Sequence, residues 1–221
     1  MIKVTRQTDP ELAALVDEEL NRQEHNIEMI ASESTAPLAV MELSGSVFTN
    51  KTLEGYPGKR FQAESEVAAK TWFFKYAASQ EFHDIMAQVV VNAKCLAEEL
   101  QKYGFRIVSG GTDNHLLVVD LRSKGLTGKT MQNALDAVGI TVNKNMIPFD
   151  PEKPGVTSGI RIGLTAVSQR GLKEPEIREI AAIINQVAEA PEDEANLKAC
   201  KAKAEALIAK FPLYPAGSFD D

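Results

Sequence analysis

The segment TNKTLEGYPGKRF, residues 49–61, brings one carboxylate, Glu54, close to three basic side chains in a stretch rich in Gly and Pro. It has neither helical nor strand periodicity, so we predict an ordered loop. Loops of this kind carry function when a rigid scaffold holds them. Glu54 could therefore act as a general acid/base, although an exposed carboxylate without a catalytic role is the commoner case.

A second chemical feature is Arg161, which lies between glycines in the apolar stretch SGIRIG. A cation inside an apolar strand must be paired or must face a cleft. The planar guanidinium suits a carboxylate ligand. The residues alone slightly favour the other interpretation, an internal salt bridge.

The remaining candidate side chains have weaker signals. Ser32 and Glu33 in IASES could bind a polar ligand or simply form a turn. His115 at the start of a strand is more typical of a hydrogen-bonded structural residue than of a catalyst, and His25 and His83 are expected on helix surfaces. The sequence contains no cluster of metal ligands. Its SGGTD segment precedes a strand, so it does not form a phosphate cradle.

Composition limits the class of protein. The 221 residues, 44% hydrophobic and 25% charged, suit one large or two small globular domains. A net charge of −7 argues against a nucleic-acid-binding surface. No membrane-spanning run or apolar signal core is present. Cys95 and Cys200 lack CxxC partners and are expected to be packed, reduced thiols, so we expect a cytoplasmic protein.

Periodicity and capping residues predict the elements. Helices are expected at 10–24, from Pro37 to near Gly45, from residue 63 to Gly104 with a break near Ser79, and from Thr127 to Gly139. Two more are expected at about 174–189 and 192–209. The predicted strands are FRIVSG (105–110), NHLLVVDL (114–121), ITVNKN (140–145) and GIRIGL (159–164).

Residues 105–189 thus follow the order β-β-α-β-β-α, which predicts an α+β two-layer domain with helices covering one face of a small sheet. We divide the chain into an N-terminal helical arm and loop (1–62), a long connecting helix (63–104), the α+β C-terminal domain (105–190) and a C-terminal helix and tail (191–221). The arm is expected to have no core of its own, and an arm of that kind commonly packs on a partner subunit.

Several long motifs carry a family resemblance. The segments NIEMIASESTAPLAVMELSGSVFTNKTLEGYPGKRF, GGTDNHLLVVDLRSKGLTGKT, GITVNKNMIPFDPEKPGVTSGIRIG and TAVSQRGLKEPE resemble serine hydroxymethyltransferase. The resemblance runs from about residue 10 to residue 190. It implies the arm and the small domain of the pyridoxal-phosphate-dependent aminotransferase-like superfamily, fold type I. The family cofactor is pyridoxal phosphate, and tetrahydrofolate is the co-substrate for interconverting serine and glycine.

The resemblance also implies roles for individual residues. The Glu54 position supplies the acid/base carboxylate near the substrate hydroxymethyl group and folate. Arg161 matches the guanidinium that binds the amino-acid carboxylate, and Ser32 matches a residue that also contacts this carboxylate. Asn145 matches a folate-contacting position.

The departures from the family are large. The sequence passes from Phe61 almost directly to a helix that follows the cofactor domain in family members, which are roughly twice as long. The missing middle would hold the Schiff-base lysine, the aspartate that pairs the pyridine nitrogen and the residues that bind the phosphate. Substitutions at Thr52, Phe61-Gln62, Ser34 and Leu164-Thr165 remove further family side chains. We therefore expect no retained cofactor-binding residue, no cofactor bound by the chain alone and a vestigial Glu54.

Two functions follow. In the first, a non-catalytic protein acts as a homodimer or as a heteromer with full-length serine hydroxymethyltransferase. Loss of the cofactor domain should then expose apolar surface at Val67, Trp72, Phe73 and Phe74, unless residues 72–74 pack into a rebuilt core. In the second, the chain keeps an amino-acid or folate site built from Glu54, Asn145 and Arg161, or has glycine hydroxymethyltransferase activity as a subunit that borrows a cofactor site. We expect neither a nucleic-acid nor a membrane partner.

Overall fold

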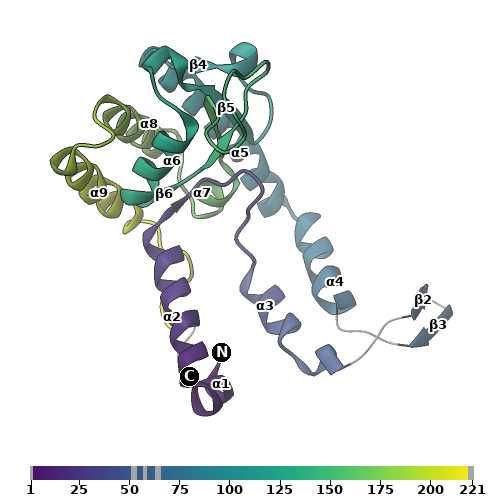
Figure 1. Cartoon of the computed structure of the whole chain (residues 1–221). Coiled ribbons are helices and arrows are strands. Elements are labelled where there is room, and N and C mark those ends of the chain that lie inside the picture. Colours follow the sequence, from purple (N-terminus) through teal and green to yellow (C-terminus); the bar gives the residue numbers. More distant parts are fainter. Residues whose placement is uncertain (1, 51–53, 57–58, 63–65, 219–221) are drawn as a thin grey trace. The chain divides into compact units, whose positions relative to one another are not determined.

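The computed structural model describes residues 2–50, 54–56, 59–62 and 66–218. The chain divides into two compact units, one formed by residues 1–33 with 88–221 and the other by residues 34–87. The long helix α5 (Gln80–Lys102) begins in the smaller unit and ends in the larger one (Figure 1). The predicted division into four segments follows the order of parts in the family. The two compact units do not test it, so it stays a prediction.

The larger unit is built on an antiparallel sheet with the strand order β4-β5-β8-β7. One face of the sheet is the core face, because Leu117 and Val119 pair with Ile162 and Ile160, and all four side chains are buried. The strands are β4 (Arg106–Ile107), β5 (Leu116–Asp120), β7 (Asn143–Asn145) and β8 (Gly159–Gly163). The predicted mixture of helices and a small sheet is confirmed.

Capping residues and glycines set the ends of helices in this unit. Thr127 caps one helix, since its Oγ1 accepts a hydrogen bond from Thr130 N at 3.1 Å. Helix α5 is closed by Gly104, whose φ of +84° is readily adopted by glycine. The helices are α1 (Lys3–Thr8), α2 (Pro10–His25), α6 (Gly128–Ala137), α7 (Thr165–Gln169), α8 (Glu174–Glu189) and α9 (Glu194–Ile208), and two 3-10 turns are η2 (Val108–Gly110) and η3 (Leu121–Lys124).

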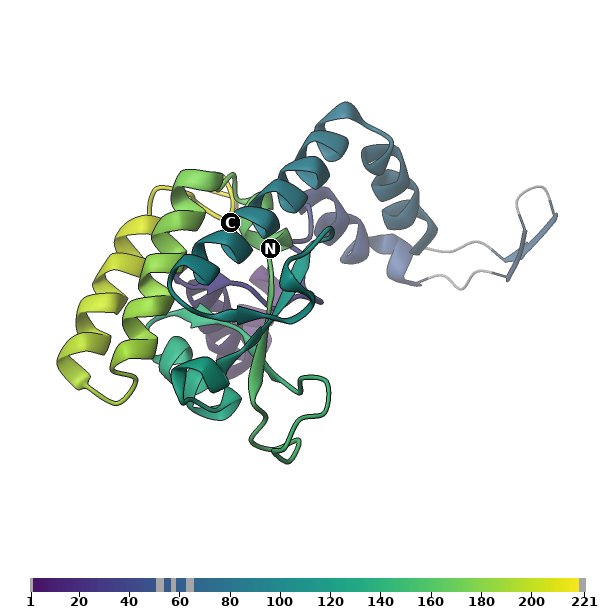
Figure 2. The same cartoon turned by 90° about the horizontal axis from the view of Figure 1, so that it is seen from above.

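The apolar faces of α5, α6 and α8 complete the core. Leu96 and Leu100 of α5, Leu135 of α6, and Ile180 and Val187 of α8 are fully buried. Figure 2 shows α8 and α9 side by side at one edge of this unit. The opposite face of the sheet carries the polar residues of the candidate site.

The first part of the N-terminal arm, residues 1–33, belongs to the same unit and is joined to it by a short parallel pair. Strand β1 (Ile27–Glu28) pairs with β6 (Ile140–Thr141), and Ile27 and Met29 are fully buried. Arg170 fixes the junction: its guanidinium donates to the carbonyls of Gln23, Glu24 and Asn26 at 2.9–3.2 Å. These carbonyls end α2, so the cation also lies at the negative end of the helix dipole.

The smaller unit is a helical module. It contains α3 (Leu38–Ser44), the 3-10 turn η1 (Val47–Asn50), α4 (Glu66–Ala77) and the beginning of α5, with α3 against α4. Two strands, β2 (Glu54–Tyr56) and β3 (Lys59–Gln62), form an antiparallel pair with a bulge between Glu54 and Gly55. The helix break predicted near Ser79 is confirmed, because α4 ends at Ala77 and α5 begins at Gln80.

One sequence-based prediction is wrong, and two are confirmed only in part. Residues 49–61 were expected as a loop, but the described part contains β2 and β3, whose strand conformation comes from mutual pairing. FRIVSG forms strand only at Arg106–Ile107, because Ser109 and Gly110 have φ values of +67° and +74° and turn the chain. ITVNKN is two strands with different partners, β6 with β1 and β7 with β8. Helices α1 and α7 and strand β1 were not predicted.

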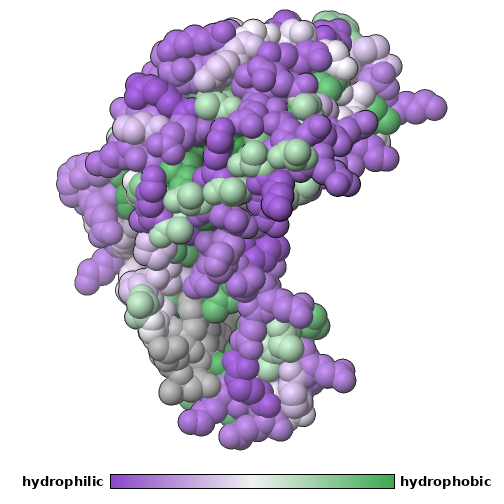
Figure 3. All heavy atoms as spheres, turned by 90° about the vertical axis from the view of Figure 1, so that its left-hand side faces the viewer, coloured by the Kyte–Doolittle hydropathy of each residue, from purple (hydrophilic) through white to green (hydrophobic). Residues whose placement is uncertain are grey.

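The surface and the thiols agree with the composition. On the face shown in Figure 3, hydrophilic residues predominate and apolar residues are scattered among them. Within the described ranges, no helix has the length and apolar character needed to cross a bilayer. Cys95 and Cys200 are free and buried, as expected.

Candidate functional site

Arg161 occupies the middle of β8 on the face opposite the core. It pairs with Val118 on one side and Asn143 on the other, so these three side chains share one face. Its Nη2 donates to Asn143 Oδ1 at 3.2 Å, and its Nε is buried without a hydrogen-bond partner. No carboxylate of the described residues lies within ion-pair distance. The internal salt bridge favoured by the sequence is therefore not found in this part of the chain, and the guanidinium keeps donors for a planar anion.

Asn145 lies two residues beyond Asn143 on the same strand and therefore on the same face. It pairs with Gly159, and its Nδ2 donates to the carbonyl of Met146 at 2.7 Å. Asn143, Asn145 and Arg161 thus lie on one sheet face. The two asparagines belong to β7, which is an edge strand of the sheet, and Arg161 belongs to the neighbouring strand β8. Sequence analysis missed Asn143, although the period-2 alternation N-K-N places it beside Asn145.

Ser32 is exposed in a turn that follows the arm strand, since Glu33 N donates to Ile30 O at 3.1 Å. The segment therefore forms a turn, and the binding role of Ser32 stays a prediction. The segment also reaches β8, because Gly163 N donates to Met29 O at 2.8 Å. Gly163 lacks a side chain where Ala31 packs, and a Cβ there would lie 2.9 Å from Ala31 Cβ. The turn that carries Ser32 is therefore held beside the end of the strand that carries Arg161.

Glu54 lies in the other compact unit. Its backbone belongs to β2 and faces Gln62 in the register of the hairpin. Thr52 lies outside the described residues. The described structure thus brings Ser32, Asn145 and Arg161 into one unit, while the acid/base role of Glu54 stays a prediction.

Asp120, on the same sheet face near β4, is hydrogen-bonded to two arginines. Asp120 accepts hydrogen bonds from Arg122 Nη2 at 2.8 Å and from Arg106 Nη1 at 2.6 Å, although its side chain is only 2% exposed. The hydrogen bonds from Arg122 are the main reason that the pKa of Asp120 is lowered to about 2, against the effect of burial. Both arginines form ion pairs with Asp120, so neither is a free cation for binding an anionic ligand.

Asp150 organises the loop between β7 and β8. It accepts hydrogen bonds from Ile147 N, Glu152 N, Ser158 N and Ser158 Oγ at 2.6–3.1 Å. Burial alone would raise the pKa of Asp150, but these hydrogen bonds together lower it to about 2. The loop is therefore tied at both ends next to Asn145 and Gly159. An aspartate followed by proline is typical of such turns, which is the signal that sequence analysis left unused.

The described residues near Arg161 do not fit an aldimine with pyridoxal phosphate. That chemistry requires a lysine amine close to the substrate carboxylate. Lys144 is next to Asn145, but it pairs with Ile160 and so points to the other face of the sheet. The turn at Ser109–Gly110 leads into a strand, so it offers no helix N-terminus to a phosphate. No group of potential metal ligands occurs among the described residues.

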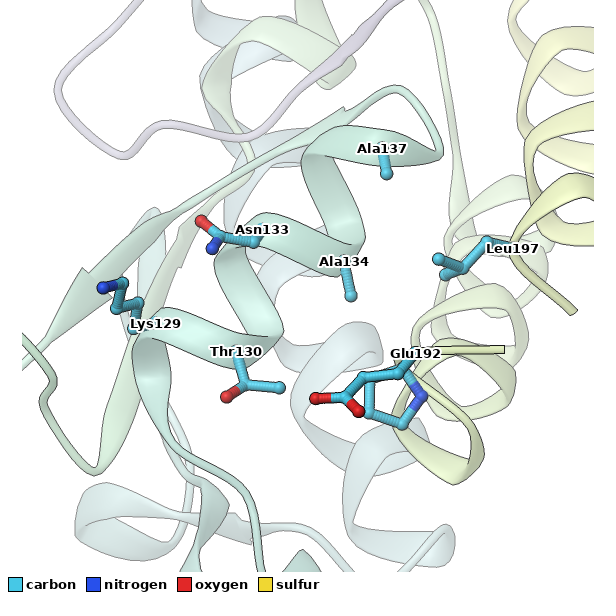
Figure 4. A pocket seen from close by; sticks show the side chains of 8 residues that line it. Lys129, Thr130, Asn133, Ala134, Ala137, Glu192 and Leu197 are labelled. Atoms are coloured by element: carbon cyan, nitrogen blue, oxygen red, sulfur yellow. The ribbon is translucent and has the colours of Figure 1, made fainter. Parts of the chain in front are cut away.

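Other hollows in the larger unit lie elsewhere. A cleft of about 310 Å³ runs between α6 and the start of α9, where Leu197 points toward α6 and Thr130 lies near Glu192 (Figure 4). Its floor is formed by Ala134 and Ala137, and it contains no buried polar group without a partner among the residues described. We interpret it as a groove between packed helices.

Comparison with known proteins identifies the family. The family model of serine hydroxymethyltransferase matches residues 5–71 and 64–184, in two segments that overlap close to the predicted junction. A serine hydroxymethyltransferase of Myxococcus xanthus is 51% identical over 148 residues, which cover 67% of this chain and 35% of that relative. The corresponding enzymes of Nitrosomonas europaea and an Acidovorax species are 53% and 52% identical, and 36% of each is covered. The matched part thus spans about a third of the length of these curated relatives, and the chain belongs to the serine hydroxymethyltransferase family.

Proposed function

We propose that this chain is a serine hydroxymethyltransferase-like protein that is not catalytic alone. It acts in the cytoplasm, within serine/glycine one-carbon metabolism, through self-association or through pairing with a full-length hydroxymethyltransferase. In this proposal the arm and the small domain of the fold type I superfamily remain, and the large cofactor domain is absent.

One observation carries the proposal. The chain matches its relatives closely but over only about a third of their length, and Lys144, on the strand paired with Arg161, points to the opposite face of the sheet. Pyridoxal phosphate would supply the electron sink that stabilises the carbanion in this family. Without a protein anchor for that group, binding of an amino acid cannot lead to reaction on the chain alone.

An absorbance experiment tests the loss of catalysis. The purified chain is mixed with pyridoxal phosphate and scanned before and after borohydride reduction, and serine cleavage is measured in parallel. We expect no stoichiometric reducible adduct and no cleavage. A reducible adduct at one equivalent per chain, together with serine cleavage by the protein alone, would overturn the proposal.

Pairing is tested by coelution with the full-length enzyme of the same organism, with each protein alone as the control. Formation of a heteromer, or of a homodimer in the chain alone, is the expected result. A chain that remains monomeric and never coelutes contradicts the interaction role.

A second function is favoured by the buried Arg161 Nε, which has no partner among the described residues. In this alternative, Arg161 and Ser32 bind an amino-acid carboxylate and Asn145 contacts folate. Binding occurs either in the chain alone or in a subunit that borrows a cofactor site and shows glycine hydroxymethyltransferase activity. If no heteromer forms and glycine or folate raises the melting temperature, the binding function replaces the first one.

A further inference from the structure

We propose that the chain pairs with a second copy of itself through an aromatic cluster in the smaller unit. The cluster consists of Trp72, Phe73, Phe74 and Tyr76 of α4 with Phe82 of α5. The inference rests on the proposed self-association, and it adds the surface and the identity of the partner.

The smaller unit has almost no core of its own. Ala69 is the one buried hydrophobic residue among its described side chains, and α3 has no buried residue. A helical module of this size normally needs a disulfide, a metal or association to be stable, because it cannot remove enough apolar surface from water. Its cysteine count is zero, and no metal-ligand group is found in the described part of the chain. Association is the remaining means of burying its apolar side chains.

The aromatic rings form one connected platform. Trp72 stacks on Tyr76 at 5.4 Å between centroids, and Tyr76 meets Phe82 edge to face at 5.5 Å. Phe82 also contacts Phe73 at 6.0 Å, and Phe73 contacts Phe74 at 6.4 Å. Such ring contacts hold the side chains in place before a partner arrives.

The platform is incompletely covered. The side chain of Phe74 is 69% exposed and that of Phe73 is 38% exposed. Two adjacent exposed aromatic side chains on a fixed support are typical of the centre of a protein interface. Of the residues expected to lose their cover, Phe73 and Phe74 are thus exposed, Trp72 is half-buried, and the side chain of Val67 lies outside the description.

The charges around the cluster favour a second copy as the partner. The chain has a net charge of −7, but residues 34–87 contain six carboxylates and five basic side chains. Two copies of this unit therefore repel each other weakly, whereas two copies of the remainder repel strongly. The near-neutral unit is the part of the chain best suited to self-association.

Exposed side chains of both signs flank the aromatic cluster in the chain. Lys75 lies on α4 beside Phe74, while Glu81 and Asp84 lie in the first turns of α5 beside Phe82, and all three are exposed. We place the two-fold axis of the dimer through the aromatic cluster, so that Lys75 of one copy pairs with Glu81 or Asp84 of the other. A closed dimer follows from that symmetry.

The single tryptophan provides a test that needs no substitution. Trp72 is the only tryptophan in the chain, and it belongs to the cluster. Dilution of the purified protein should shift its emission to longer wavelength over the same concentration range in which light scattering records a fall from dimer to monomer mass. An emission maximum that stays constant while the mass halves overturns the proposal, because the interface then lies elsewhere.

Substitutions test the surface directly. Phe74→Asp should weaken the dimer by at least a hundredfold. The control is Phe149→Asp, at a fully exposed side chain of the larger unit, which should leave the dimer intact. Lys75→Glu and Asp84→Lys should each weaken the dimer roughly tenfold, and the double variant should restore it. Circular dichroism checks that each variant is folded.

The outcomes separate this inference from the proposed function. A dimer that survives Phe74→Asp overturns the surface and leaves self-association standing. A chain that is monomeric alone but coelutes with the full-length enzyme overturns the second copy as partner and leaves the pairing function standing. A monomer that never coelutes overturns both.

Discussion

Arg161 Nη2 donates a hydrogen bond to Asn143 Oδ1 at 3.2 Å across the β7–β8 pair, while the buried Nε of the same guanidinium has no partner among the described residues. The amide fixes the orientation of the guanidinium without neutralising it. This relationship is what a carboxylate site requires, because an arginine already paired with an acid would have to break that pair before binding a ligand.

Removal of the guanidinium tests ligand binding. If the chain binds glycine, Arg161→Ala should remove about 1.5–3 kcal/mol of binding free energy, which weakens the Kd roughly ten- to a hundredfold. Arg161→Lys should recover only part of it, since an ammonium group cannot donate in a bidentate fork. Isothermal titration calorimetry gives the Kd.

The matched control is Arg178→Ala, which removes an exposed arginine of the same unit whose Nε lies 3.4 Å from Glu99. This variant should bind glycine as the original chain does. Equal losses in the two variants would mean that binding follows the overall charge and not the site.

The Asp120 network predicts a difference between buried and exposed ion pairs. Asp120→Asn should lower the free energy of unfolding by about 1.5–3 kcal/mol, because two arginines and a backbone N–H lose a charged acceptor. Asp17→Asn, which breaks the exposed pair with Arg6 at 2.7 Å, should cost only about 0.2–1 kcal/mol. Urea denaturation measures both, and equal effects would contradict this interpretation.

The same carboxylate sets a pH dependence. Its pKa is lowered from 3.8 to about 2 in the folded protein, so the unfolded state takes up a proton first as the pH falls. The stabilisation is therefore complete above about pH 5 and is lost between about pH 4 and pH 2. The difference in unfolding free energy between the original chain and Asp120→Asn should shrink over that window, and a constant difference would argue against the assignment.

The Asp150 loop predicts a change in protease sensitivity. Asp150→Asn leaves four donors with a weaker acceptor, so the loop should open more often and chymotrypsin should cleave faster after Phe149, whose side chain is fully exposed. Ser158→Ala removes only the hydroxyl bond and should have a smaller effect. Faster cleavage in Ser158→Ala than in Asp150→Asn would contradict this account.

The sequence predicted those elements whose stability is local. Helix α8 has its predicted limits, and α2 ends within one residue of its predicted end, because apolar periodicity and end residues such as Pro10 are encoded in the helix itself. The mixed fold and Arg161 also followed from short-range pattern. The turn at Ser32 was one of two interpretations left open.

The missed features depend on partners distant in the sequence. Strand β1 has only two residues, and it is a strand because β6 lies beside it. Asn143 becomes part of the candidate site only through its pairing with Arg161, and the contact between Asp120 and Arg106 likewise joins two neighbouring strands. No local pattern of residues contains these pairings, so the candidate site was predicted only in part.

Gly163→Ala tests the attachment of the arm to the sheet. A Cβ at Gly163 would lie 2.9 Å from Ala31 Cβ and 3.0 Å from Ala31 N, so the backbone at Ala31 must move away. We expect a loss of about 1–3 kcal/mol in the free energy of unfolding and faster amide hydrogen exchange at Met29, whose carbonyl accepts from Gly163 N. Gly155→Ala is the control, since that Cβ meets no atom within 4 Å. An unchanged exchange rate at residues 27–31 in Gly163→Ala would contradict the close contact between the arm and β8, and with it the placement of Ser32 beside Arg161.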